Sequence, residues 1–125
     1  MRYDTDIYYS SQNEPYEKNR GYVIDEGSTF RIGFSAQEYG FEVKNENGKV
    51  TVARKGEQAY EIYLTKTPSS FTLKTPYGNL VYQTRLLSYS LEKKPNSYML
   101  TLKYSLTDNS GHSQENVLKL RGMIK

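Results

Sequence analysis

The sequence contains no cysteine and only one histidine, His112. The absence of cysteine excludes disulfides, zinc sites with cysteine ligands and cysteine nucleophiles. Because small secreted domains usually carry disulfides, it also favours an intracellular protein. A histidine-based triad or metal site would need partners from other histidine or cysteine residues, which the chain lacks. We therefore expect His112, in the polar stretch from Asp108 to Asn116, to be a solvent-exposed loop residue.

Long apolar runs are also missing. No apolar stretch approaches the roughly 20 residues that a membrane-spanning helix needs. The first residues, Met1 to Tyr9, lack the apolar run of a signal peptide. The net charge is only +3, and basic and acidic residues are interleaved along the chain, which is typical of a solvated surface. These features predict a cytoplasmic protein with no membrane partner, and they disfavour a nucleic-acid partner.

The chain carries no recognisable catalytic or cofactor fingerprint. Its nine glycines are scattered and form neither GxxxxGK nor GxGxxG, so no nucleotide site is predicted. Paired carboxylates can serve as acid and base in glycoside hydrolysis when they are buried close together. The acidic pairs Glu57 with Glu61 and Asp4 with Asp6 lie beside a glycine turn and near the chain end, so we expect them to be solvated. The sequence therefore predicts a protein that is not an enzyme and that holds no metal or cofactor.

What the sequence does contain is a regular alternation of apolar and polar residues. This period of two predicts strands with one buried face, and turn-forming residues separate them at intervals of roughly 8–12 residues. Asn47-Gly48 predicts a type I′ hairpin turn, and Pro76 with Gly78 fits a type I turn. Helical spacing is not sustained anywhere. The predicted inward positions are Phe30, Ile32, Phe34, Ala36; Tyr39, Phe41, Val43; Val50, Val52; Tyr60, Ile62, Leu64; Phe71, Leu73; Leu80, Tyr82, Thr84, Leu86; Tyr98, Leu100, Leu102, Tyr104, Leu106; and Leu118, Leu120, Ile124.

The expected fold is all-β, with residues 1–125 in a single domain and residues 10–20 as a polar, mobile loop. An antiparallel meander of eight to ten strands avoids exposed edges by closing into a barrel. A barrel of that size is either filled by side chains or holds one small ligand. The 13 tyrosines, with large rings and polar tips, favour a well-filled or flattened barrel.

Three segments carry a family resemblance. They are the run from Val50 to Gly56, the strand and Thr75-Pro76-Tyr77-Gly78 turn from Phe71 to Gly78, and the pair of strands Leu100 to Leu106 and Asn116 to Leu120. In order and spacing, over about residues 48–122, they resemble the YwiB-like family of small proteins from Gram-positive bacteria. The resemblance implies a calycin-like (lipocalin-type) antiparallel β-barrel. That family is a domain of unknown function, so the resemblance assigns no functional residue.

Arg54 is the most interesting charged residue. Alternation places it on the same face as Val50 and Val52, which is the predicted interior. A cation inside a small barrel is costly unless it is paired. Arg54 is thus either an anchor for an anionic headgroup, or a strand-end residue that leans out to solvent or pairs with a glutamate at the rim. The further candidate ligand contacts are tyrosines on inward faces: Tyr60, Tyr82 and Tyr104.

Three functions remain open at this level. The leading hypothesis is a cytoplasmic, non-catalytic module that binds a small apolar or amphipathic ligand inside the barrel. The main alternative is a solid barrel that binds a protein partner or forms a homodimer. A third alternative is single-stranded nucleic-acid binding on an outer face. Its candidate residues are Tyr77, Tyr82, Tyr89, Lys74, Arg85 and Lys103, although cross-strand tyrosine packing explains the same tyrosines.

Overall fold

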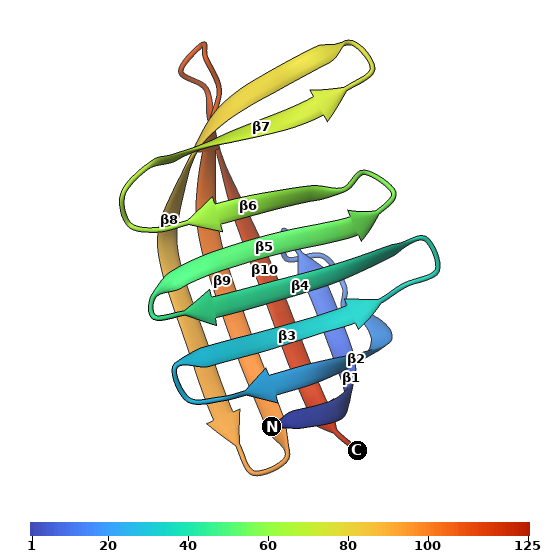
Figure 1. Ribbon diagram of the computed structural model, residues 1–125. Coiled ribbons are helices and arrows are strands. Elements are labelled where there is room, and N and C mark those ends of the chain that lie inside the picture. The colour runs from blue at the N-terminus through green and yellow to red at the C-terminus, as the bar shows by residue number, and fades with distance from the viewer.

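The computed structural model describes residues 1–125 as ten antiparallel β-strands in one domain, which confirms the predicted all-β barrel (Figure 1). It contains no helix that could span a membrane. The strands are β1 (Arg2–Ser11), β2 (Glu17–Asp25), β3 (Thr29–Ser35), β4 (Tyr39–Glu46), β5 (Lys49–Gly56), β6 (Tyr60–Leu64), β7 (Ser69–Thr75), β8 (Gly78–Lys94), β9 (Ser97–Thr107) and β10 (Ser113–Ile124).

β1 joins the two halves of the sheet. The strand order is β6-β5-β4-β3-β2-β1-β10-β9-β8-β7, so the first strand pairs with both β2 and the last strand. In Figure 1 the strands β2 to β6 cross in front of the long strands β8 to β10, and the two termini lie close together. The predicted alternation begins at Phe30, so β1 and β2 are strands that the sequence pattern does not predict.

The predicted loop over residues 10–20 is shorter in the structure. β1 continues to Ser11 and β2 begins at Glu17, which leaves five connecting residues, 12–16. Gln12 fixes this connection to β10, because its backbone N–H donates to the Val117 carbonyl (2.8 Å) and its side-chain oxygen accepts from the Val117 N–H (2.7 Å). The polar composition of residues 10–20 therefore indicated a connection at the right place, but the connection is shorter than predicted.

The barrel is nearly closed. β6 and β7 lie at the two ends of the strand order and share no ladder. The end of β6 is held to β8 instead: the Leu86 N–H donates to the Thr65 carbonyl (2.9 Å). The buried Thr84 hydroxyl lies within hydrogen-bond distance of two carbonyls, those of Tyr63 (3.1 Å) and Ser69 (3.2 Å), and shares its single proton between them. Beyond this junction, the β7–β8 hairpin extends past β6 without pairing to it (Figure 1).

Two of the turns expected from the sequence occur in the structure. Asn47 and Gly48 have φ values of 53° and 88° and connect β4 to β5 as a two-residue turn, as predicted. Such positive φ values are those of a type I′ hairpin. Pro76 and Tyr77 connect the paired residues Thr75 and Gly78 of β7 and β8.

One half of the barrel interior is filled by apolar side chains. Ile7, Val23, Ile32, Leu100 and Leu120 have no solvent exposure. Towards the end with the chain termini, Phe30 packs against Tyr98 at a ring-centroid distance of 5.5 Å. Lys93 covers this pair with an ion pair to Asp25 (3.0 Å). This end is therefore plugged, in agreement with the filled barrel that the tyrosine content favoured.

Two glycines allow β2 and β3 to approach closely in this filled half. A Cβ on Gly21 would lie 2.0 Å from the Gly33 carbonyl oxygen and 2.6 Å from Ile7. A Cβ on Gly33 would meet the Phe41 carbonyl oxygen at 2.7 Å. Only residues without a side chain fit at these positions.

Candidate functional site

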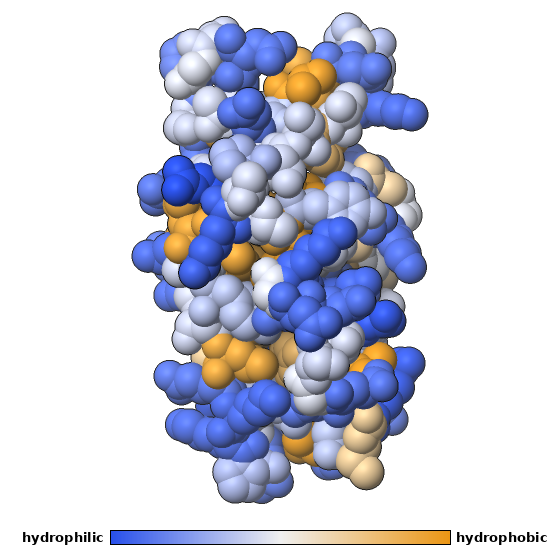
Figure 2. Space-filling view, turned by 60° about the vertical axis from the view of Figure 1, so that its left-hand side comes forward, coloured by the Kyte–Doolittle hydropathy of each residue, from blue (hydrophilic) through white to orange (hydrophobic).

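The opposite end of the barrel contains a pocket of about 510 Å³. It opens where β7 departs from β6, and its wall comes from β1, β6, β7, β8, β9 and β10. Figure 2 shows hydrophobic atoms in a notch at the upper end of the molecule, between two hydrophilic lobes. The lining is Tyr9, Ser11, Gln58, Ala59, Tyr60, Ile62, Phe71, Leu73, Lys74, Thr75, Pro76, Tyr82, Tyr104, Leu106, Asn116 and Leu118.

The structure brings the three candidate tyrosines together in this pocket. Tyr60 from β6, Tyr82 from β8 and Tyr104 from β9 all line it. Phe71 packs between two of them, since its ring centroid lies 6.2 Å from that of Tyr60 and 6.3 Å from that of Tyr82. Three residues that are far apart in the sequence thus form one aromatic wall.

Arg54 lies next to this pocket but not in its lining. It faces inward like Val52 and pairs directly with Tyr60 in the β5–β6 ladder. Its guanidinium lies 3.9 Å from the ring centroid of Tyr39, and its Nε donates to the Glu57 carbonyl (2.9 Å). The charge is half-buried at the rim and contacts a ring and a backbone carbonyl, so the predicted pairing with a glutamate side chain is not formed. The role of Arg54 as an anchor for an anionic group stays a prediction.

Burial sets the protonation of the tyrosines around the pocket. Loss of hydration raises the pKa of Tyr9 to about 12 and also raises the pKa of Tyr60 and of Tyr104. The nearby Arg54 charge acts in the opposite direction on Tyr9 and Tyr60. At neutral pH all three hydroxyls are therefore protonated and can donate hydrogen bonds to an acceptor in the pocket.

Tyr9 is the pocket residue that sequence reasoning missed. Its ring packs against Phe41 (5.0 Å) and Phe34 (5.3 Å), and it forms the floor of the pocket on the β1 side. The signal was present, because Thr5, Ile7 and Tyr9 alternate in the same way as the residues of later strands. The apolar signal of this segment is weak because two of its three inward residues, Thr5 and Tyr9, carry hydroxyl groups.

The other candidate residues lie outside any shared site. His112 is exposed in the β9–β10 turn, as predicted, with Asp108 at 3.7 Å. Glu57 and Glu61 are exposed, and Asp6 forms ion pairs with Lys18 and Lys125. No group of three histidine, cysteine or carboxylate side chains is placed to hold a metal ion.

The six residues proposed for nucleic-acid binding do not form one surface. Tyr82 and Tyr89 pack against the core, whereas Tyr77 is fully exposed at the β7–β8 turn. Arg85 and Lys103 are exposed on β8 and β9.

Comparison with known proteins identifies the family. The profile of a domain of unknown function, DUF1934, matches residues 4–120, almost the entire chain. The chain belongs to this family. It also resembles the crystal structure of the YwiB protein from Bacillus subtilis, with a TM-score of 0.72 and 12% sequence identity over 99% of this chain and 93% of that one. No curated protein matches the sequence.

These matches confirm the predicted family resemblance and the barrel. The DUF1934 description assigns no activity, and at 12% identity the YwiB structure shows a shared fold only.

Proposed function

We propose that this DUF1934 protein is a non-catalytic, cytoplasmic binding module that holds a small amphipathic ligand in the open end of its barrel. The observation that supports this proposal is the pocket of about 510 Å³ walled by Tyr9, Tyr60, Tyr82 and Tyr104. Ligand sites are usually concave, mostly apolar, and supplied with a few polar groups that orient the ligand. This pocket has that composition.

The side chains suggest how such a ligand would lie. Ile62, Phe71, Leu73 and Leu106 offer apolar contacts for its hydrophobic part. The protonated tyrosine hydroxyls can donate to a carbonyl, ether or carboxylate oxygen. Arg54 at the rim adds a positive charge, so an anionic group near Tyr60 would be favoured over a cationic one.

Native mass spectrometry of protein purified gently from a bacterial host tests the proposal directly. We expect a mass adduct that is lost on denaturation, because an apolar pocket tends to retain a ligand from the host. An unliganded native mass, together with no binding of the amphipathic anion 1-anilinonaphthalene-8-sulfonate, would contradict the proposal.

Matched substitutions locate the binding. We expect Tyr60→Ala to weaken binding of 1-anilinonaphthalene-8-sulfonate about tenfold, because it removes a pocket wall. Tyr63→Ala, on the same strand but 44% exposed, should change binding less than twofold. Arg54→Ala should weaken binding of the anion, whereas its exposed neighbour Lys55→Ala should not. Equal effects within either pair would place the dye elsewhere.

A protein partner or homodimer is the second candidate function. β6 and β7 have no neighbour on one side of the sheet. Near the β7–β8 turn, Tyr77, Leu80 and Val81 expose apolar area. Unpaired strand edges and exposed apolar side chains are typical of docking surfaces. A native dimer mass without an adduct would favour this function over ligand binding.

A further inference from the structure

The outer surface of β8, β9 and β10 carries an ordered set of side chains. Strand register aligns residues of these three strands in rows, and each row described below lies two residues earlier in β10 than the one before it. One row contains Arg121, Met99 and Glu92, and the next contains Lys119, Thr101 and Ser90. Two more rows follow, the first with Val117, Lys103 and Ser88, and the second with Glu115, Ser105 and Arg85.

Each of these four rows contributes one cation. They are Arg121, Lys119, Lys103 and Arg85, which form an oblique track of roughly 20 Å at the rise of an extended strand. None of the four forms a salt bridge, and neither does Lys94 at the lower end of the track. A single-stranded polyanion would meet this track as a regular series of positive charges.

Few carboxylates offset this charge. Glu92 and Glu115 are the acidic residues in the four rows, so with Lys94 the face has five cations against two carboxylates. Asp6, which pairs with Met123 on the adjacent strand, is already bound by Lys125 (3.2 Å) and Lys18 (3.8 Å). The excess of three positive charges on this one face equals the net charge of the whole chain, +3.

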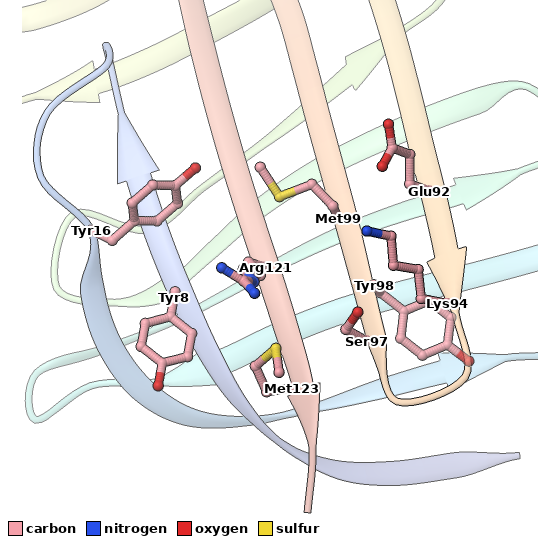
Figure 3. Close-up of a pocket in the computed structure, with 9 residues that line it drawn as sticks. All are labelled: Tyr8, Tyr16, Glu92, Lys94, Ser97, Tyr98, Met99, Arg121 and Met123. Atoms are coloured by element: carbon pink, nitrogen blue, oxygen red, sulfur yellow. The ribbon is translucent and has the colours of Figure 1, made fainter.

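A groove of about 680 Å³ lies at the lower end of the track, and it is larger than the pocket in the barrel. Figure 3 shows Tyr8 and Tyr16 on one side of the groove, Arg121 and the two methionines Met99 and Met123 in its centre, and Lys94 on the far side. Tyr16 is 46% exposed. Flat tyrosine rings beside free cations are the elements with which proteins bind single-stranded nucleic acids, by stacking bases and neutralising phosphates.

We infer that this outer face binds single-stranded nucleic acid, with bases at Tyr8 and Tyr16 and the phosphate backbone along Arg121, Lys119, Lys103 and Arg85. An acidic protein is the competing partner. The regular one-cation-per-row spacing favours a repeating polyanion, and the hydroxyls of Ser88, Ser90, Thr101 and Ser105 between the cations can donate to phosphate oxygens. The site is separate from the barrel pocket, so it stands or fails independently of the proposed ligand function.

Fluorescence anisotropy with a labelled 20-nucleotide oligothymidylate tests this inference. Phosphate contacts from these four cations and Lys94, five in all, predict a slope of about −3.5 for the logarithm of affinity against that of salt, or about a 100-fold loss between 50 and 200 mM salt. The double substitution Lys119→Gln/Arg121→Gln should reduce affinity at least tenfold and bring the slope to about −2. Tyr16→Ala should reduce affinity at least fivefold, whereas Tyr16→Phe, which keeps the ring, should not.

The matched control removes two cations from elsewhere. Lys55→Gln/Lys66→Gln lowers the net charge by the same amount on exposed residues of another face, and affinity should change less than twofold. Absence of binding at 50 mM salt, or an equal loss in this control, would overturn the inference. A third result would also overturn it: polyglutamate at an equal concentration displaces the oligonucleotide, and Tyr16→Ala has no effect. That result would assign the face to an acidic protein.

Discussion

Both ends of the barrel are built from strands whose residues alternate between inward and outward positions, but one end is filled and the other holds a pocket. At the plugged end, branched aliphatic side chains such as Ile7, Ile32 and Leu100 meet in the centre and leave no exposure. At the open end, inward positions carry tyrosines such as Tyr60 and Tyr104, and a pocket remains between them. The comparison shows that the strand period decides which side chains point into the barrel. Whether these side chains fill the interior depends on where neighbouring strands separate.

The largest effect should come from a cavity at the plugged end. Leu100→Ala removes a fully buried side chain, and we expect a loss of about 2–5 kcal/mol in the free energy of unfolding. Leu106→Ala, on the same strand but lining the pocket, should cost only about 1 kcal/mol, because the space beside it is already open. Urea denaturation followed by circular dichroism measures both. Equal losses would show that both ends are packed alike.

A smaller effect should come from the close approach of β2 and β3. Gly21→Ala places a Cβ 2.0 Å from the Gly33 carbonyl oxygen, so we expect a loss of about 2–3 kcal/mol as the strands move apart. Gly40→Ala is the control, since the new Cβ would lie 3.8 Å from its nearest neighbour, the Phe34 carbonyl oxygen, and it should change stability by less than about 0.5 kcal/mol. Thermal unfolding of the two variants compares them. The prediction fails if Gly21→Ala melts like the parent protein.

Alkaline pH should destabilise the folded protein through its buried tyrosines, including Tyr9 at the open end and Tyr98 at the plugged end, because burial raises the pKa of both. Burial raises the pKa of Tyr9 to about 12, so the folded state retains a proton that the unfolded chain releases near pH 10. The stabilisation is complete below about pH 10 and is lost as the pH rises towards 12, by at most about 1.4 kcal/mol per pH unit for this residue. Denaturant unfolding between pH 9 and 11.5 checks this, and Tyr9→Phe should make the decline shallower. A variant with the same decline as the parent would exclude Tyr9 as a contributor.

The smallest effect concerns one buried hydroxyl that faces the core. The Tyr89 hydroxyl is buried without a well-formed hydrogen bond, although Asn45 lies near enough to influence its pKa. Tyr89→Phe should therefore leave stability unchanged or raise it by up to about 1 kcal/mol. The partly exposed Tyr82, in the pocket wall, provides the comparison: Tyr82→Phe should change stability little and ligand affinity more. A loss above about 1 kcal/mol for Tyr89→Phe would reveal a hydrogen bond to that hydroxyl.

The sequence by itself determined the fold class and most of the interior. Strand period is a local property, so the alternation from Phe30 onward predicted most of the buried faces, and Asn47-Gly48 predicted its turn. The prediction was wrong at Leu80, which is 48% exposed because the β7–β8 hairpin extends past β6 and has no strand opposite it. It also placed Tyr60, Tyr82 and Tyr104 on inward faces without any knowledge of their neighbours.

Only the tertiary structure decided how these faces combine. The central position of β1, the departure of β7 from β6 and the meeting of Tyr9 with the other tyrosines depend on pairings between distant segments. The track of cations on β8, β9 and β10 likewise depends on strand register. The sequence around Arg121, Lys103 or Arg85 does not determine which residues these cations lie beside. Register is set by the fit of whole strands against one another, and a shift of one residue would turn each of these side chains to the opposite face.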